Sequence, residues 1–395
     1  MKEKIKIAAK KYLSETIEIR RHLHAYPELS FEEYATSDYI ASKLKQYNIP
    51  FSQGIVKTGI VALIEGNNPS KKVIAFRADM DALPIPETNN VEYKSKNAGI
   101  MHACGHDVHS ASLLGAAKIL NELKNEFEGT IKLIFQPGEE KLPGGASLMI
   151  KENVLENPHA QSILAQHVFP SMEVGKVGFR NGMYMASTDE IYVTVIGKGG
   201  HAAMPNDYNN PLLIASKIIL ELNTIFMLQP QKVPTVLAFG KIAGNGATNV
   251  IPNEVLLEGT FRTMNEIWRK EAHSKMQNIA ESIALEMGGI CEFKIVSGYP
   301  FLVNDETTTN NARAAAEDYL GKENVEELPM RMTAEDFSFY SQQIPSCFYR
   351  LGTGNKSKGI VSGVHTSTFD IDENALEIGA GLIAWLAINE LNVSS

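Results

Sequence analysis

The chain has 395 residues, of which 44% are hydrophobic and 21% charged, values typical of a folded globular protein. This length predicts two domains, because a single hydrophobic core rarely grows beyond about 300 residues. The net charge is −9 and no long Lys/Arg cluster is present, which argues against a nucleic-acid partner. The three cysteines are too few for a disulfide scaffold and favour a reducing cytoplasm.

The sequence also argues against a membrane partner. The amino terminus is basic and lacks a continuous apolar stretch, so we expect no signal peptide. The apolar run "AGLIAWLAI" near the carboxyl terminus is far too short to cross a bilayer. These features predict a cytoplasmic protein.

The first half of the chain alternates apolar strands with helical segments. Strands are predicted at 71–78, 130–135 and 161–166, and helices at 109–123 and 146–156. These strands are apolar throughout, which indicates burial on both faces. Strand–helix alternation of this kind predicts an α/β fold with a mainly parallel sheet covered by helices.

The middle of the chain has a different pattern, because segment 190–199 alternates apolar and polar residues. It is followed by a helix at 211–226, strands at 235–244 and 254–263, a helix at about 266–287 and a strand at 291–298. The order βαββαβ is typical of a ferredoxin-like sandwich. We predict an inserted domain at 186–298, with 1–185 and 299–395 forming the main domain.

Polar residues suited to binding ligands follow several of the apolar strands. Asp79 and Asp81 follow the first strand, Glu139 and Glu140 follow the second, and His167 follows the third. The segment "HACGHDVH" (102–109) opens a helix. Ligands bind at the carboxyl ends of strands in open α/β sheets, so these four segments predict one shared site.

Cys104 has four interpretations: a buried thiol, half of a disulfide, a nucleophile beside His106 or His109, or a metal ligand. The low cysteine count argues against the disulfide. Thiolate, imidazole and carboxylate groups together bind divalent metals, and a further glutamate can serve as general base. A cysteine hydrolase, a non-catalytic binding protein and a structural zinc domain remain the rival classes. Asp107 and His109 are expected to support the site or the start of the helix.

Five motifs then carry a resemblance to a known family. They are "FRADMDALP" (76–84), "HACGHDVH" (102–109), "FQPGEE" (135–140), "GKGGHAAMP" (197–205) and "GTFRT" (259–263). The chain resembles the two-metal aminoacylase and carboxypeptidase family, in the amidohydrolase branch of hippurate hydrolases, auxin-conjugate hydrolases and N-acetyldiaminopimelate deacetylases. The resemblance covers essentially the whole chain. It implies a metallo-exopeptidase-like main domain, and an inserted domain that serves as a lid and dimerisation surface.

The resemblance also implies the roles of individual residues. The implied metal ligands are Cys104, His106, Glu140, His167 and His365, with Cys104 able to bridge two divalent ions. Glu139 matches the general base. Asp79 and Asp81 match the segment of the family's other active-site carboxylate. Many relatives have a histidine ligand where this chain has Asp79, so we expect Asp79 to orient a ligating imidazole or to tune the metals.

Three residues of the inserted domain match substrate-binding positions of the family. His201 matches a histidine that reaches a neighbouring subunit's site and polarises the scissile carbonyl. Asn249 and Arg262 match residues that help to hold substrate, and a guanidinium suits a substrate carboxylate. The resemblance therefore implies a homodimer formed through the lid.

The implied activity is metal-dependent hydrolysis of the amide bond of small N-acyl amino acids, with an N-acetyl, benzoyl or similar acyl group. A water shared by two metal ions attacks the amide. Glu139 takes the proton of this water and delivers it to the leaving amine. A dipeptidase or carboxypeptidase of the same family, or an N-acetyldiaminopimelate deacetylase, is the alternative. The ligands favour manganese or zinc, and cobalt or nickel also fit them.

Overall fold

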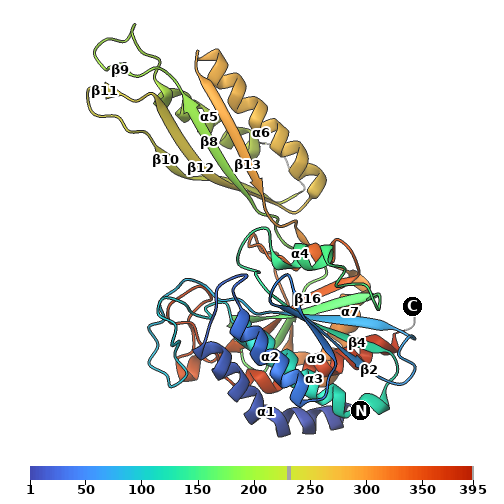
Figure 1. Cartoon of the computed structure of the whole chain (residues 1–395). Helices are drawn as coiled ribbons and strands as arrows, with labels where there is room; N and C mark the ends of the chain where they lie inside the picture. Colours follow the sequence, from blue (N-terminus) through green and yellow to red (C-terminus); the bar gives the residue numbers. More distant parts are fainter. Residues whose placement is uncertain (229–232, 394–395) are drawn as a thin grey trace. The chain divides into compact units, whose positions relative to one another are not determined.

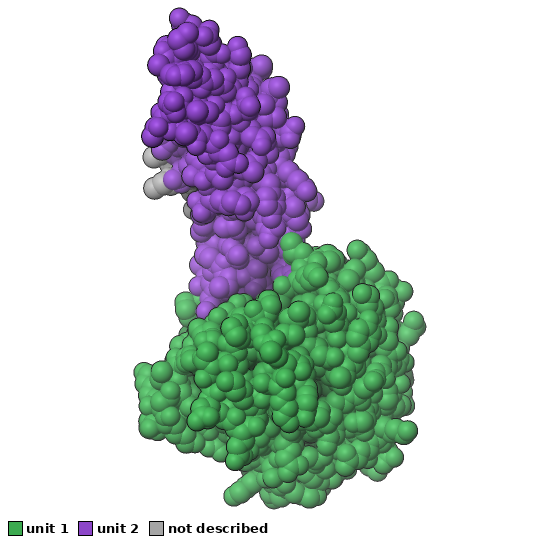
Figure 2. All heavy atoms as spheres, turned by 60° about the vertical axis from the view of Figure 1, so that its left-hand side comes forward, with its two compact units in different colours: residues 1–182, 303–329, 336–395 green, residues 183–302, 330–335 purple. Residues whose placement is uncertain are grey.

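The computed structural model describes residues 1–228 and 233–393; residues 229–232 of the predicted inserted domain and the last two residues lie outside the described ranges. The chain divides into two compact units (Figure 2). Unit 1 comprises Met1–Gly182, Val303–Pro329 and Asp336–Ser395, and unit 2 comprises Met183–Leu302 and Met330–Glu335. Among the described helices, none has the length and apolar character needed to span a bilayer.

Unit 1 is built on an eight-stranded sheet in the order β1-β2-β4-β3-β5-β16-β6-β15. The strands are β1 (Phe51–Ile55), β2 (Gly59–Glu65), β3 (Val73–Asp79), β4 (Thr130–Gln136), β5 (Ser162–Glu173), β6 (Val177–Phe179), β15 (Val325–Glu327) and β16 (Ser346–Gly354). The four central strands β4, β3, β5 and β16 are parallel, whereas β1, β2 and β6 pair antiparallel to a neighbour. The predicted α/β fold with a mainly parallel sheet is confirmed.

Helices cover both faces of this sheet (Figure 1). They are α1 (Lys2–Ala25), α2 (Tyr34–Gln46), α3 (His106–Glu122), α4 (Gly145–Lys151), α7 (Glu306–Leu320), α8 (Ser338–Ser341) and α9 (Ala375–Asn392), with 3-10 turns at Lys124–Glu126, Lys322–Asn324 and Lys356–Lys358. Helices α1, α3 and α9 pack together on one face, and α4 lies on the other. The apolar side chains of α3 and α9 are almost all buried, so both helices lie in the hydrophobic core.

The helix predicted at 146–156 is shorter than expected, since α4 ends at Lys151. Its continuation is broken at Asn153, which has a left-handed φ of 58°. The carbonyl groups of Val154, Glu156 and Pro158 accept hydrogen bonds from Nζ of the buried Lys132, at 2.7–2.9 Å. These carbonyls are bound to a side chain of β4, so they do not continue a helix.

Strand register places the polar residues of the sheet at one level. In the parallel pairs, Asp79 of β3 lies beside Gln136 of β4, and Arg77 lies beside Ala165 of β5. His167 is therefore level with Asp79. The expectation that His167 follows the end of its strand is wrong, because β5 continues to Glu173 through its pairing with β16. His167 nevertheless lies where its other neighbour, β3, ends.

Unit 2 contains a four-stranded antiparallel sheet in the order β10-β12-β8-β13, the arrangement of a ferredoxin-like βαββαβ unit. Its elements are β8 (Asp189–Ile196), β9 (Gly200–His201), α5 (Pro211–Leu228), β10 (Thr235–Ala243), β11 (Val250–Ile251), β12 (Glu254–Thr263), α6 (Glu266–Glu286) and β13 (Ile290–Ser297). Strands β7 (Gly182–Met185) and β14 (Leu302–Asn304) contain two of the four points where the chain passes from one unit to the other; the other two are at 329/330 and 335/336.

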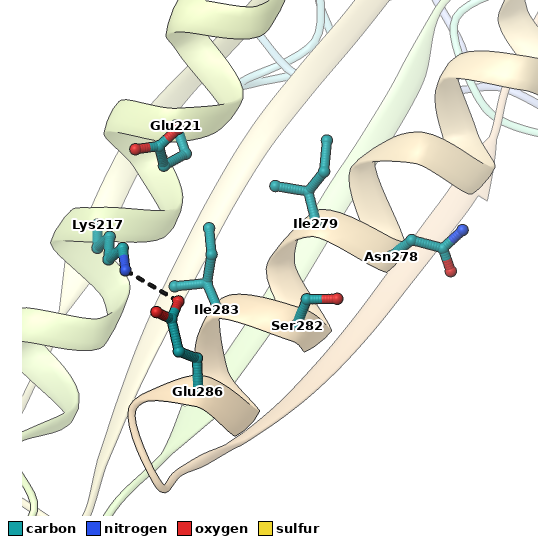
Figure 3. A pocket seen from close by; sticks show the side chains of 7 residues that line it. All are labelled: Lys217, Glu221, Asn278, Ile279, Ser282, Ile283 and Glu286. Carbon is teal, nitrogen blue, oxygen red and sulfur yellow. Dashed lines mark hydrogen bonds and ion pairs between the residues drawn. The ribbon is translucent and has the colours of Figure 1, made fainter.

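Helices α5 and α6 lie side by side on one face of the unit 2 sheet (Figure 1). Figure 3 shows the groove between them, which is crossed by an ion pair between Lys217 and Glu286 at 3.1 Å. The groove is lined by Lys217, Glu221, Asn278, Ile279, Ser282, Ile283 and Glu286. None of these is a histidine or cysteine, so the groove lacks the soft ligands of the predicted metal site.

Candidate metal centre

The turn before α3 presents Cys104 and His106 on either side of Gly105. Gly105 has a left-handed φ of 81°, and a Cβ atom on it would lie 2.6 Å from Val168 Cγ2. Glycine is therefore required both by the backbone angle and by the close approach to β5. This approach brings Cys104 Sγ to 3.6 Å from Nε2 of His167, the residue before Val168.

His365 joins the same cluster from the loop after β16. Its backbone N–H donates to the carbonyl of Ala103 at 2.7 Å, which ties this loop to the turn that carries Cys104. Its Nε2 lies 3.3 Å from Cys104 Sγ and 3.2 Å from Glu140 Oε1. His365 has a left-handed φ of 61°, a strained conformation that often marks functional positions.

The sequence-predicted ligands form overlapping groups. Within each group the potential ligand atoms lie within 4.8 Å of one another; the groups include Cys104–His106–His167, Cys104–Glu140–His365 and His106–Glu139–Glu140. Cys104 belongs to the first two groups. The structure thus gathers the five predicted ligands in two groups that share Cys104, and it places Glu139 beside His106 and Glu140.

Asp81 orients two of these residues. Its Oδ1 accepts a hydrogen bond from Nδ1 of His106 at 3.1 Å, and its Oδ2 accepts one from the backbone N–H of Glu140 at 2.9 Å. The hydroxyl of Ser30 donates to the same Oδ2 at 2.6 Å. A carboxylate on the far nitrogen of a ligating imidazole is the usual support for a metal site, because it fixes the tautomer and the ring orientation.

Asp79 binds a different histidine. Its Oδ1 accepts from Nδ1 of His109 at 2.5 Å, and its Oδ2 accepts from Arg77 at 2.5 Å. The other ring nitrogen of His109 accepts the backbone N–H of Val168 at 2.9 Å. His109 therefore has both nitrogens engaged and supports β5 rather than offering a ligand atom. Asp79 lies 3.8 Å from Nε2 of His106, so its charge still reaches that imidazole.

Asp107 points away from this cluster into a buried ionic network. Its Oδ2 accepts hydrogen bonds from Nε of Arg20 and Nδ1 of His24, both at 2.8 Å. Burial raises the pKa of Asp107, but Arg20 and His24 outweigh that effect and hold it far below its ordinary value. These contacts join the first turn of α3 to α1, which is a supporting role of the kind expected from the sequence.

The loop that carries Glu139 and Glu140 is held by residues that the sequence patterns did not single out. The carboxylate of Glu33 accepts the backbone N–H of Gly138 at 2.8 Å, and the N–H of Asp336 lies 3.4 Å from Glu139 Oε1. Asp336 is itself bound by Arg77 and Gln136 at 2.7–2.9 Å. Glu33 and Asp336 lie far apart in the sequence and form no common motif. The acidic segment "PELSFEE", which contains Glu33, is the sequence feature that could have pointed to this role.

The electrostatics of the cluster fit a cation. Hydrogen bonds to Cys104 and Glu140 raise the pKa of His365 to about 10, which shows how strongly the thiol and carboxylate attract positive charge. Burial lowers the pKa of His167 and keeps its imidazole neutral. Among the described residues, Nε2 of the buried His106 has no hydrogen-bond partner. A buried nitrogen without a hydrogen-bond partner is destabilising unless a ligand binds it, and these residue types suit divalent metals.

The cysteine-hydrolase alternative gains one feature from the structure, because Asp81 orients His106 as a third catalytic group would. The burial and the raised pKa of the Cys104 thiol argue against this alternative. Cys104 is buried, and burial raises its pKa, whereas a nucleophilic cysteine needs a lowered pKa and access to substrate. That alternative also leaves His167, Glu140 and His365 without a role.

The three predicted residues of unit 2 fall into two places. His201 in β9 pairs with Val250 in β11, and Asn249 directly precedes β11; both side chains are exposed. Nδ1 of His201 accepts the N–H of Ala203 at 3.1 Å, so its Nε2 carries the proton. Arg262 lies near the opposite end of β12, roughly 26 Å along the strand from its start.

Arg262 is half-buried and donates to the carbonyl of Met332 at 3.2 Å. Burial lowers its pKa, and the guanidinium has no carboxylate partner among the described residues. It is thus a cation held in place by one backbone contact. Its distance from the β9–β11 pair means that one small substrate cannot contact His201 and Arg262 of the same unit 2.

The fold and the ligand cluster together define a hydrolase of the metal-dependent exopeptidase type. The sequence pattern of peptidase family M20/M25/M40 matches residues 75–389, and the chain belongs to this family. The predicted family and the predicted enzyme class, a metallo-amidohydrolase, are confirmed.

Individual relatives agree with this membership. The chain is 38% identical over 397 residues to thermostable carboxypeptidase 2 of Saccharolobus solfataricus, covering 99% of each chain. It is 39% identical to N-acetyl-L-cysteine deacetylase of Bacillus subtilis, covering 91% of this chain and 84% of the relative. A Bacillus subtilis crystal structure described as a dinuclear metal binding peptidase is 33% identical, with a TM-score of 0.83 over 98% of this chain and 100% of that chain.

Proposed function

We propose that the protein hydrolyses the amide bond of N-acyl amino acids at a centre of two divalent metal ions. One observation carries the proposal: two groups of potential ligands overlap at Cys104, and Glu139 lies beside them without being needed for either. The first group adds His106 and His167, and the second adds Glu140 and His365. Overlap at a thiolate supports two ions that share one ligand.

Two divalent ions held by these residues would lower the pKa of a water molecule and polarise the amide carbonyl. The ligands include a soft thiolate, three imidazoles and a carboxylate, a set that suits zinc or manganese and also accepts cobalt or nickel. Asp81 fixes the tautomer of His106 so that Nε2 faces the centre. Burial lowers the pKa of His167, so its imidazole is neutral. Its Nδ1 donates to the carbonyl of Val168 at 2.8 Å, which leaves Nε2 without a proton.

Glu139 serves as the general base and then as the general acid. It takes a proton from the attacking water and delivers it to the amide nitrogen, which leaves as an amine. The backbone N–H of Asp336 donates to Glu139 Oε1 at 3.4 Å and favours this orientation of the carboxylate. Because Glu139 is in a loop closed by the hydrogen bond from Gly145 N to Gly138 O, its position is set by the backbone.

His201 and Asn249 act on the site of a second subunit. Their separation from Arg262 along β12 supports this arrangement, since all three match substrate-binding positions. Nε2–H of His201 is available to donate to the carbonyl oxygen and to the charge that develops on it. The protein therefore functions as a homodimer, with each lid completing the site of its partner.

Arg262 binds the carboxylate of the amino-acid half of the substrate. The guanidinium is half-buried and lacks a carboxylate partner among the described residues, so it can form a bidentate pair with one. The N-acetyl-L-cysteine deacetylase relative supports a small acyl group, and the carboxypeptidase relative supports peptides as the second candidate. The free thiols of all three cysteines support a reducing, cytoplasmic location.

The test is an assay of the purified protein with a panel of N-acetyl, N-benzoyl and dipeptide substrates after loading with manganese, zinc, cobalt or nickel. We expect hydrolysis of N-acyl amino acids, abolished by EDTA and restored by metal. Retained activity in EDTA with loss on thiol alkylation would favour the cysteine hydrolase. No hydrolysis of any substrate by metal-loaded protein would refute the proposal.

The dimer arrangement has a test of its own. Glu139→Ala and His201→Ala proteins are each expected to be nearly inactive, but mixing them after subunit exchange should restore activity. In the mixed dimer, the site of the His201→Ala subunit keeps Glu139 and receives His201 from its partner. Absence of complementation, with subunit exchange verified by mass spectrometry, would place His201 and Glu139 in the same subunit.

A further inference from the structure

The segment between α1 and α2 contacts the loop that carries Glu139. Residues 28–33, "ELSFEE", include Ser30 and Glu33, whose side chains contact Asp81 and Gly138. Ser30 donates to Asp81, which binds His106 and Glu140. Glu33, in the same segment, is completely buried although it is a carboxylate. A buried carboxyl group needs partners, so the contacts of Glu33 indicate what it does.

Each oxygen of Glu33 has a defined partner. Oε1 accepts two backbone N–H groups, those of Phe31 and Gly138, both at 2.8 Å. Oε2 accepts the hydroxyl of Thr58 at 2.7 Å. One oxygen atom thus joins the α1–α2 segment directly to the residue before Glu139.

A second contact fixes the same residue. Gly138 has a left-handed φ of 63°, and a Cβ atom on it would lie 2.4 Å from two ring carbons of Phe31. The ring of Phe31 therefore lies directly against the backbone of the catalytic loop. Phe31 itself has a left-handed φ of 67°, which is unusual for an aromatic residue, and its N–H is held by Glu33. Glu33 stabilises both partners of this contact.

We infer that Glu33 is a positioning residue for the reaction: it holds the Gly138 backbone so that Glu139 faces the attacking water. The inference rests on the proposed function, because it assigns to Glu139 the role of base. Glu33 acts through the loop and not on the substrate, so its removal should lower kcat while KM changes little. A misplacement of about 1 Å at a catalytic group is enough to lower the rate by about 100-fold.

The experiment compares Glu33→Ala with Glu33→Gln, with Glu32→Ala as the matched control. The amide of glutamine can accept both N–H groups on its oxygen and donate to Thr58, so it preserves the geometry without the charge. Glu32 is the adjacent carboxylate, and its side chain is exposed. Kinetic constants are measured per folded, metal-loaded protein, using thermal unfolding and metal analysis of each variant.

We expect Glu33→Ala to lose about 100-fold in kcat with unchanged metal content, and KM within about twofold of wild type. Glu33→Gln should recover kcat to within about threefold, because the hydrogen bonds are retained. Glu32→Ala should match wild type. Normal kcat in Glu33→Ala would overturn the inference, and so would loss of metal as the sole cause of a lower rate.

Amide hydrogen exchange separates this inference from the proposed function. The N–H of Gly138 is buried and should exchange slowly in wild type and Glu33→Gln, and much faster in Glu33→Ala. This result is independent of any substrate. If wild type hydrolyses no N-acyl amino acid, the proposed function fails, and the exchange of Gly138 still decides whether Glu33 holds the loop. Unchanged exchange in Glu33→Ala would overturn the positioning role.

Discussion

Unit 1 and unit 2 hold their candidate functional residues in opposite ways. In unit 1, His106 and Glu140 are bound by Asp81, and every contact among them is buried or nearly so. In unit 2, His201 and Asn249 are exposed, and Arg262 has a single backbone partner at 3.2 Å. The contacts of unit 1 are thus already formed within the chain, whereas the exposed residues of unit 2 leave room for the partners that we propose for them, a substrate carboxylate and the site of a second subunit.

The strongest test of this comparison is Glu139→Ala in unit 1. A general base typically contributes up to about 10⁴-fold, and we expect kcat to fall by about that factor. The protein should keep its metal content, because the ligand groups remain without Glu139. Steady-state kinetics and metal analysis check both points; an active variant would remove Glu139 from the mechanism.

Unit 2 also has a buried ionic network, but a structural one. Asp189 accepts hydrogen bonds from Arg269 at 2.5 and 2.9 Å and from His273 at 2.7 Å. Removing one partner of a buried pair costs about 3 kcal/mol or more, so Asp189→Ala should destabilise unit 2 by that amount. Chemical denaturation of the full chain, followed by hydrogen exchange in β8 and α6, measures the effect. Destabilisation confined to unit 1 would contradict the expectation.

The same network predicts a dependence of stability on pH. Burial raises the pKa of Asp189, but hydrogen bonds from His273 and Arg269 outweigh it and hold the pKa below its ordinary value. The folded form therefore releases its proton more readily than the unfolded form. Its contribution is fully present above about pH 4 and is lost as the pH falls through the folded-state pKa. Asp189→Asn should flatten this acid limb of the stability profile.

Asp81 and Asp79 offer a narrower comparison within unit 1. Asp81→Asn should weaken metal binding by about 10–100-fold, because Asp81 orients the imidazole of His106. Asp79→Asn should affect metal binding less, since Asp79 mainly binds His109 and Arg77. Metal titration with a competing chelator ranks the two variants. The reverse ranking would show that the charge of Asp79 matters more than the orientation of His106.

The smallest expected effect lies in unit 2. Arg262→Lys keeps the charge but loses the bidentate geometry, and we expect KM to rise by about tenfold with kcat nearly unchanged. The same change should matter little for a substrate whose carboxylate has been converted to an amide. An equal rise in KM for both substrates would show that Arg262 does not recognise the carboxylate.

The sequence predicted the elements that local patterns define. Strands such as β4 are buried along their whole length, and their apolar runs report this directly. The residues around "HACGHDVH" and "FQPGEE" were found because ligand-type side chains follow such strands. The extent of β5 was missed, because β16 is its partner and pairs beyond the level where β3 ends. Pairing between strands distant in sequence is not encoded in either strand alone.

His365 and Glu33 show where residue patterns reach their limit. His365 meets Cys104 across 261 residues, and family resemblance alone identified it. Glu33 looks like an ordinary acidic residue in a polar segment, yet it is buried against Gly138. Its burial results from the packing of the α1–α2 segment on the catalytic loop. A property that arises only from tertiary contact leaves no periodicity in the sequence.

The place of β16 in the sheet has a consequence for synthesis on the ribosome. β16 lies between β5 and β6, yet it follows the whole of unit 2 in the chain. While unit 2 is being translated, β5 has an unpaired edge next to the centre of an apolar sheet, which is a template for aggregation. We therefore expect the nascent chain to be prone to aggregation until residues 346–354 emerge. Chains truncated before β16 should accumulate as aggregates even though most of the sheet has already been made.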